Sequence, residues 1–263
     1  MSIPILKTEN LAIGYCSKNK SKQVIVQSDL NISLKQGALT ALLGINGIGK
    51  STLLRTLNGV QLPIHGQVTL NNRNINSYTE NELAQQISIV LTEKIPISNL
   101  TVYELIKIGR TPYLSWNTNL SDEDHNWINK AISLTNLEKL TNKSIHELSD
   151  GQLQRVLIAR AIAQNTSIII LDEPTNHLDL HHKVSLIKLL KKLAKEENKA
   201  ILFSAHDIDI ALQLSDEIII LQEGYNVQGT SDELINKGIF NHFFPDDNLT
   251  FNPLQKRFEL KID

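Results

Sequence analysis

The sequence predicts an α/β fold with a mainly parallel core sheet, an N-terminal antiparallel β region and a helical insertion. Three observations lead to this fold class. Strand-like apolar runs alternate with amphipathic helical patterns from residue 38 onward. Residues 11–34 hold short apolar runs without a helical period, and residues 101–140 hold helical patterns without a convincing strand. Strands that alternate with helices are typical of a parallel sheet covered by helices.

The strands are predicted from the position of the apolar runs. The N-terminal runs lie at residues 11–13, 24–26 and 30–34, and the polar segment 17–22 after the first of them indicates an antiparallel hairpin region. The core strands are expected at residues 38–43, 88–91, 167–171, 200–203 and 217–221.

The helical stretches define the expected domain organisation. Residues 102–108 and 122–134 have helical patterns and form the predicted insertion. Beyond about residue 236 the pattern weakens, and the Phe and Pro residues there indicate no particular element. We therefore expect a single domain over residues 3–235, a helical subdomain inserted at about residues 93–155, and a tail of unknown role at residues 236–263.

Composition excludes several classes of protein. The chain is 41% hydrophobic and 21% charged, which is typical of a globular protein and unlike a disordered or fibrous one. Its net charge of −2, from 26 basic and 28 acidic residues, provides no field that would attract nucleic acid, and we predict no such partner. No apolar run is long enough to span a bilayer, and residues 1–9 lack the features of a signal peptide.

A glycine-rich segment lies between the strand expected at residues 38–43 and a helix-like stretch at residues 52–58. It reads G-I-N-G-I-G-K-S-T and satisfies the phosphate-loop pattern G-x-x-x-x-G-K-[ST]. Its residues are Gly44, Ile45, Asn46, Gly47, Ile48, Gly49, Lys50, Ser51 and Thr52. Glycines let the backbone approach a polyphosphate, so that amide groups and the positive end of the helix hold its oxygens. We predict that Lys50 contacts the β- and γ-phosphates and that Ser51 coordinates Mg²⁺.

Two acidic residues, Asp172 and Glu173, follow the apolar run 168–171, at the strand end where a parallel sheet forms its ligand crevice. Asp172 can hold Mg²⁺ through its water shell, and Glu173 can orient or deprotonate an attacking water. In isolation the pair would be an ordinary acidic turn. Together with a phosphate loop it predicts a nucleotide-hydrolysing site.

Three further motifs accompany the phosphate loop and the acid pair. The first is an L-S-D-G-Q segment before a long helical pattern, made of Leu148, Ser149, Asp150, Gly151 and Gln152. The second is N-H-L-D, which ends at Asp179, and the third is S-A-H-D, which contains His206. In this order, over about residues 3–235, the sequence resembles the ATPase subunits of ABC transporters, which are P-loop NTPases.

This resemblance implies ATP and Mg²⁺ as cofactors. It implies that Glu173, His206 and Lys50 are catalytic, that Tyr15 stacks on adenine beside the phosphate loop, and that Asp179 belongs to the D-loop. The L-S-D-G-Q signature would complete the ATP site of a second copy of the chain. We therefore expect a dimer that holds two ATP molecules between its subunits.

Two positions depart from the family pattern. Asp150 stands where the family has glycine, so a carboxylate would face the partner's triphosphate, although aspartate also favours helix N-termini. Thr92, with Glu93 beside it, occupies the Q-loop position where the family has glutamine. These departures make a regulatory subunit with impaired hydrolysis an alternative interpretation. The adjacent pair His181 and His182 is too weak a signal to predict a metal site.

Residues 101–113, T-V-Y-E-L-I-K-I-G-R-T-P-Y, resemble a stretch of the importers for ferric siderophores, haem and cobalamin. The resemblance implies an ATP-hydrolysing subunit that powers such an importer. It would dock peripherally on integral permease subunits at the cytoplasmic face of the inner membrane, and work indirectly with a substrate-binding protein. Tyr113, Leu114 and Trp116 would form either a permease interface or the core of the insertion. A soluble ABC ATPase that does not act in transport is the alternative from another class.

Overall fold

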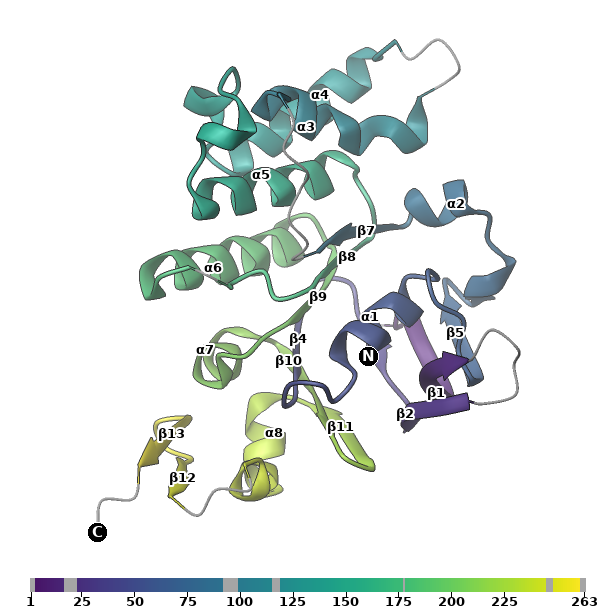
Figure 1. Cartoon of the computed structure of the whole chain (residues 1–263), viewed down its shortest axis with the longest axis vertical. Coiled ribbons are helices and arrows are strands. Elements are labelled where there is room, and N and C mark those ends of the chain that lie inside the picture. Colours follow the sequence, from purple (N-terminus) through teal and green to yellow (C-terminus); the bar gives the residue numbers. More distant parts are fainter. Residues whose placement is uncertain are drawn as a thin grey trace.

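The computed structural model describes residues 3–16, 23–91, 99–114, 119–176, 178–244 and 248–260. Within these residues the chain forms two main sheets, helices that cover them, and a short C-terminal hairpin (Figure 1). The α/β fold class, with its N-terminal antiparallel β region, is confirmed.

The central sheet has six strands in the order β11-β10-β4-β9-β8-β7. All neighbours are parallel except β10 and β11. The strands are β4 (Leu39–Leu43), β7 (Ile87–Val90), β8 (Ile168–Leu171), β9 (Ala200–Ser204), β10 (Glu217–Gln222) and β11 (Tyr225–Gly229). The five parallel strands are those that the apolar runs predicted. The prediction lacked β11, because an edge strand that is not fully buried carries no continuous apolar run.

The N-terminal sheet is antiparallel, with the order β2-β1-β5-β6, and β3 also pairs with β1. Its strands are β1 (Leu6–Cys16), β2 (Gln23–Leu30), β3 (Ser33–Leu34), β5 (His65–Leu70) and β6 (Arg73–Asn74). The sequence prediction lacked β5 and β6. The first half of β5 is exposed and polar, so it shows neither an apolar run nor a clear alternation.

Helices flank both sheets. They are α1 (Lys50–Leu57), α2 (Glu80–Ala84), α3 (Val102–Lys107), α4 (Asp122–Leu134), α5 (Asp150–Ala163), α6 (Leu180–Glu196), α7 (Ile208–Leu214) and α8 (Ser231–Asn236). Short 3₁₀ turns lie at Ile75–Ser77, Ile108–Tyr113, Glu138–Leu140, Ile145–Glu147 and Ile239–His242. Reciprocal capping boxes begin α2, α3, α4, α5 and α8, which explains why a serine or threonine precedes each of them.

Helices α3, α4 and α5 pack together in a helical layer at the top of Figure 1. A buried ion pair joins the 3₁₀ turn after α3 to α4, with 2.7 Å between Arg110 Nε and Asp124 Oδ1. Arg110 also donates to the carbonyl of Ala163 at the end of α5, at 2.9 Å. The ring of Tyr113 lies against this guanidinium, with 4.0 Å between the ring centroid and Cζ of Arg110. Tyr113 is nevertheless 37% exposed. Trp116 lies outside the described residues.

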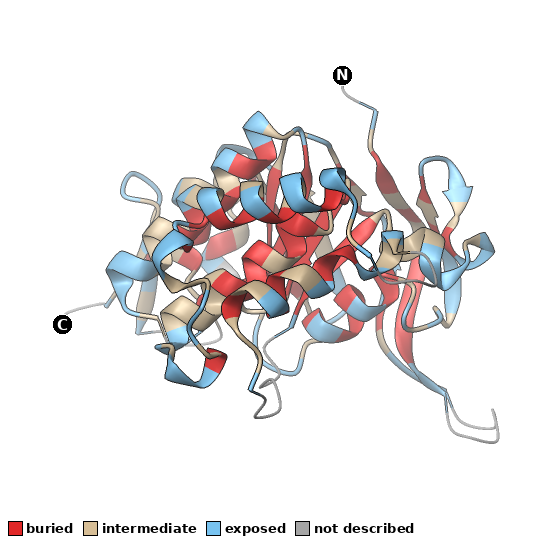
Figure 2. Ribbon diagram, turned by 90° about the horizontal axis from the view of Figure 1, so that it is seen from above, coloured by how far each residue is buried: buried red, intermediate tan, exposed pale blue. Residues whose placement is uncertain are grey.

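The core consists of two layers, one on each face of the central sheet. Side chains alternate along each strand, so Leu39, Ala41 and Leu43 of β4 face the core shared with α3 to α7, while Leu42 faces α1 and the N-terminal sheet. Figure 2 shows the consequence, with buried strands at the centre and helices that are exposed on their outer faces.

None of the helices in the described ranges is long and apolar enough to cross a membrane.

The C-terminal segment forms the hairpin β12 (Leu249–Asn252) and β13 (Arg257–Leu260). Its aromatic residues pack into the same core as α7, and the Phe240 and Phe251 rings stack with centroids 4.9 Å apart. The sequence indicated no element here because these elements are short and spaced by polar residues.

Candidate functional site

The predicted motifs follow strands that lie side by side in the central sheet. The phosphate loop follows β4, His206 follows β9, and Asp172 follows β8, and these three strands are adjacent and parallel. The carboxyl ends of parallel strands open the ligand crevice of such a sheet. Thr92 and Glu93, which follow β7, lie outside the described residues.

The phosphate loop has a backbone that only glycine adopts easily. Gly47 and Gly49 have φ angles of 80° and 111°, in the left-handed region. A Cβ atom at Gly49 would also lie 2.6 Å from Cγ1 of Val26, whereas one at Gly47 would meet nothing within 4 Å. Gly49 caps α1 without a side-chain hydrogen bond, and the first turn of α1 holds no acidic residue. The amide groups at this helix end therefore form a site suited to an anion.

Lys50 begins α1 and is only 6% exposed. Its Nζ donates to the carbonyl oxygens of Gly44, at 2.8 Å, and Ile45, at 3.2 Å, so the side chain folds back over the loop. Burial lowers the pKa of the Lys50 ammonium, while the charges of Glu173 and Asp172 act in the opposite direction. The structure thus brings the loop lysine and the acid pair into one electrostatic environment.

Ser204, at the end of β9, connects the two acidic residues. Its hydroxyl donates to Oδ1 of Asp172 and accepts from the backbone N–H of Glu173, both at 2.7 Å. Ser204 is fully buried, so water cannot replace these bonds easily. Sequence reasoning did not identify this residue as functional. A serine directly before Ala205 and His206, at the end of an apolar strand, was the available signal.

Glu173 lies in an unusual backbone conformation, with a φ of 46°. A non-glycine residue in this region stores of order 1 kcal/mol or more of strain, and such residues occur preferentially at functional sites. Its Oε1 lies 2.6 Å from Nε2 of His206, and its Oε2 accepts a hydrogen bond from Asn176. The carboxylate is thereby held towards the histidine from the neighbouring strand.

Tyr15 and Ser51 lie at the margin of the loop. Tyr15 is the penultimate residue of β1, and its hydroxyl lies 2.9 Å from Oγ1 of Thr52 in α1, with 52% of the residue exposed. Ser51 is exposed in the first turn of α1. A pocket of about 200 Å³ adjoins the loop and is lined by Gly44, Ile45, Asn46, Ala205, His206, Ile208, Phe243 and Phe244. No pattern in the sequence indicated that Phe243 and Phe244 approach the site.

The L-S-D-G-Q segment does not join this site within one chain. It lies at the start of α5, which packs into the core with α3 and α4, whereas α1 packs on the opposite face of the sheet (Figure 1). Ser149 caps α5 by accepting from the backbone N–H of Gln152, and Gln152 Oε1 accepts from the N–H of Ser149. Asp150 is exposed in the first turn, where the helix dipole favours a negative charge. The positive end of α5 is therefore presented at the surface.

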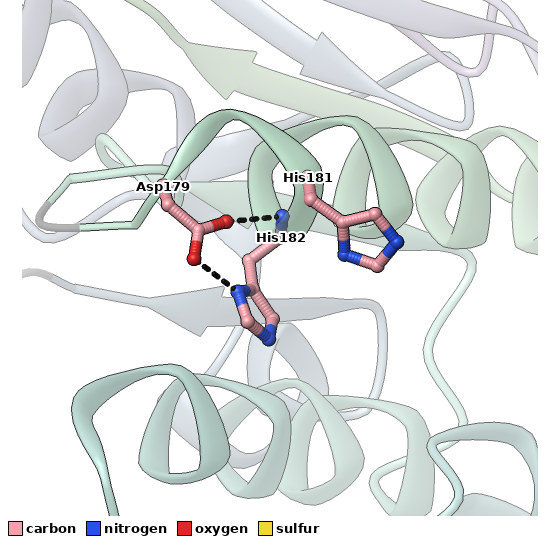
Figure 3. A group of neighbouring side chains, drawn as sticks. All are labelled: Asp179, His181 and His182. Atoms are coloured by element: carbon pink, nitrogen blue, oxygen red, sulfur yellow. Dashed lines mark hydrogen bonds and ion pairs between the residues drawn. The ribbon is translucent and has the colours of Figure 1, made fainter.

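Asp179 caps α6 and does not contact the phosphate loop in any of the described interactions. Its Oδ1 accepts from the backbone N–H of His182 at 2.9 Å, and its Oδ2 lies 2.8 Å from Nδ1 of the same histidine (Figure 3). These two hydrogen bonds lower the pKa of the Asp179 carboxyl, and the bond from the His182 backbone has the larger effect. His181 lies beside them, and His177 is outside the described residues.

Comparison with known proteins gives a consistent result. A family model described as ABC transporter matches residues 27–176. The iron(3+)-hydroxamate import ATP-binding protein of Bacillus subtilis (strain 168) is 39% identical over 243 residues, which cover 92% of this chain and 88% of that protein.

Two solved structures share the fold. A metal-chelate type ABC transporter in an inward-facing conformation has a TM-score of 0.78 and 28% identity, covering 92% of this chain and 89% of that chain. A dimeric ATP-binding cassette with ADP and Pi bound has a TM-score of 0.73 and 29% identity. The match covers 86% of this chain and 98% of that chain.

Proposed function

The chain belongs to the ABC transporter family of ATPases, whose model matches residues 27–176, and from that premise we propose that it powers an importer of metal chelates. A ferric siderophore is the cargo that its relatives favour, since one is named for iron(3+)-hydroxamate import and a structural neighbour for metal chelates. Haem and cobalamin are the alternative cargoes of the same branch. Neither comparison favours an ATPase outside transport.

One observation carries the ATPase assignment. Lys50, the Asp172–Glu173 pair and His206 lie in segments that follow three adjacent parallel strands, near the carboxyl ends of those strands. We assign the phosphate loop and Lys50 to the ATP phosphates, because amide groups, a helix N-terminus and a cation there stabilise negative charge. The half-exposed ring of Tyr15 supplies a surface for adenine.

Glu173 is the residue suited to act on the attacking water. Its carboxylate bonds to His206 at 2.6 Å and accepts a second hydrogen bond from Asn176, and these two bonds restrict its orientation. We assign proton acceptance or water orientation to Glu173, and contact with the γ-phosphate to His206. Ser204 positions both acids but touches neither substrate nor water in this scheme.

The donor set fits Mg²⁺. Ser51 offers an exposed hydroxyl next to the phosphate loop, and Asp172 offers a carboxylate that Ser204 holds in place. Hard oxygen donors of this kind suit Mg²⁺, with water completing its shell. When bound, the ion would neutralise charge on the phosphates.

We further propose that two copies of the chain hold two ATP molecules between them. The exposed start of α5, with Ser149 at its cap and Gly151 in its first turn, forms an anion site that no loop of the same chain uses in the described structure. A partner's phosphate loop would face it. The dimeric cassette with ADP and Pi supports this arrangement, since it shares the fold.

The permease would dock on a pocket between α2, β7 and α5. The pocket has a volume of about 490 Å³ and combines apolar side chains with Arg160 and Gln164. Val60, at its rim, is 73% exposed. A groove lined by both apolar and polar side chains suits a short amphipathic helix of a membrane subunit. This docking would place the chain peripherally at the cytoplasmic face of the inner membrane, with a substrate-binding protein acting on the other side.

Uptake by the reconstituted transporter tests the function. The chain, its permease and the binding protein are placed in liposomes with ATP on the side of the chain, and uptake of iron-labelled hydroxamate is measured. We expect ATP-dependent uptake that is lost in Lys50→Ala. Uptake of cobalamin or haem, but not of the ferric hydroxamate, would overturn the cargo assignment, and no uptake of any of them would overturn the importer.

A further inference from the structure

Three metal-ligating side chains gather at the start of α6. Asp179, His181 and His182 each offer one ligand atom, and these atoms all lie within 4.8 Å of one another. Figure 3 shows the aspartate just before the helix and the two imidazoles projecting from its first turn. The pair of histidines alone was insufficient to predict a site, and the structure adds the carboxylate. All three residues are exposed, so an ion can reach them from solvent.

The geometry needs little change to bind an ion. The carboxylate of Asp179 already lies 2.8 Å from Nδ1 of His182, and the two imidazole rings are edge to face with centroids 5.6 Å apart. Zinc bonds of about 2.0–2.2 Å place tetrahedral donor atoms roughly 3.3 Å apart. The side chains of Asp179 and His182 are 66% and 49% exposed, so rotation can close the remaining distance.

The donor set selects the type of ion. Two imidazoles and one carboxylate, with an open side to water, suit Zn²⁺ and similar transition-metal ions. Mg²⁺ prefers oxygen donors in an octahedral shell and would not compete. This site therefore differs in chemistry from the Mg²⁺ site assigned to Ser51 and Asp172.

The cluster adjoins the L-S-D-G-Q segment. A Cβ atom at Gly151 would lie 4.0 Å from Cδ2 of His182 and 3.4 Å from Cδ2 of Leu178. Such distances are ordinary van der Waals contacts, so the start of α5 and the start of α6 lie next to each other at this junction. An ion bound by Asp179, His181 and His182 would hold the His182 ring, which lies at this junction, in one orientation.

We propose that Asp179, His181 and His182 form a binding site for one Zn²⁺-class ion in each chain, and that the bound ion slows ATP turnover by restraining the junction with the L-S-D-G-Q segment. The binding half of this proposal does not depend on the function proposed above. The effect on turnover rests on it.

Co²⁺ is the probe for binding, because its visible absorption changes when side-chain ligands replace water and alter its coordination geometry. The full chain is titrated with Co²⁺ and then with Zn²⁺, in the wild type, in His181→Ala, and in His65→Ala as a control for an exposed histidine elsewhere. We expect one Co²⁺ per chain, displacement by Zn²⁺, and affinity reduced by more than about tenfold in His181→Ala only. Equal affinity in all three proteins, or no change in the Co²⁺ absorption, would overturn the site.

ATP hydrolysis with and without Zn²⁺, at constant excess Mg²⁺ and ATP, tests the restraint. His181→Ala is the matched control, because Zn²⁺ binds nucleotide equally in both reactions. We expect Zn²⁺ to slow the wild type several-fold more than the variant. If Zn²⁺ slows hydrolysis equally in both proteins while Co²⁺ still binds to the wild type, the proposed restraint is wrong but the metal site stands. Absence of hydrolysis without Zn²⁺ would instead count against the proposed ATPase and leave the binding result unaffected.

Discussion

Replacing Ser204 with alanine removes the link between the two acids. The change deletes a hydroxyl that donates to Asp172 and accepts from the N–H of Glu173, both at 2.7 Å, at a fully buried position. A buried N–H left without a partner costs about 1–3 kcal/mol, and a bond to a charged acceptor contributes a similar amount. Because Asp172 is only half-buried, water recovers part of its bond. We expect the free energy of unfolding to fall by about 2–3 kcal/mol.

The same substitution should lower turnover. If misplacement of Glu173 raises the barrier by about 1.4 kcal/mol, kcat falls about tenfold, while KM for ATP changes little because Ser204 does not contact the phosphate loop. Urea unfolding and steady-state hydrolysis measure both effects. Ser215→Ala is the control, since the Ser215 hydroxyl is buried without a hydrogen-bond partner in the described structure. An unchanged kcat in a Ser204→Ala protein that has lost stability would refute the positioning role.

Three further substitutions test the fold and the loop. Gly49→Ala should weaken ATP binding more than Gly47→Ala in nucleotide titrations, because only at Gly49 would the Cβ atom clash. Asp124→Asn should lower the free energy of unfolding by about 3–5 kcal/mol in urea, because it leaves the buried positive charge of Arg110 without a compensating negative charge. Burial lowers the pKa of Lys199 to about 8 from 10.5, so the unfolded chain binds more protons between these values and stability rises with pH there. Lys199→Met should remove this rise, which amounts to about 3 kcal/mol.

Each of these predictions has a contradicting result. Equal ATP affinity in the two glycine variants would mean that the loop adapts to the side chain. A loss of stability in Asp124→Asn no larger than that of Glu196→Gln, at an exposed ion pair with Lys192, would mean that burial adds nothing. Parallel pH profiles of the wild type and Lys199→Met between pH 8 and 10 would contradict the lowered pKa of the lysine.

The elements that were predicted best are those whose own residues form a strong local pattern, such as an apolar run or a fixed motif. The apolar run at Ile168–Leu171 and the fixed order G-I-N-G-I-G-K-S-T carry their information within a few residues, and both have the expected structure. In contrast, β5 and β11 form because a neighbouring strand pairs with them, which leaves little trace in their own sequences.

The site shows the same division. The sequence identified Glu173 and His206 as candidates, but their 2.6 Å contact depends on β8 and β9 being neighbours in the sheet. It did not identify Ser204 or the approach of Phe244 to the loop, because both depend on contacts between distant segments. The roles of all these residues in hydrolysis remain predictions.

The most direct test of the central claim is ATP hydrolysis by the assembled transporter that carries Glu173→Gln. The substitution preserves size and the possibility of a hydrogen bond but removes the negative charge next to His206. We predict that hydrolysis falls by about 100-fold or more, while ATP binding stays close to that of the wild type. Equal hydrolysis rates in the wild type and Glu173→Gln would contradict the assignment of Glu173 and, with it, the account of the site.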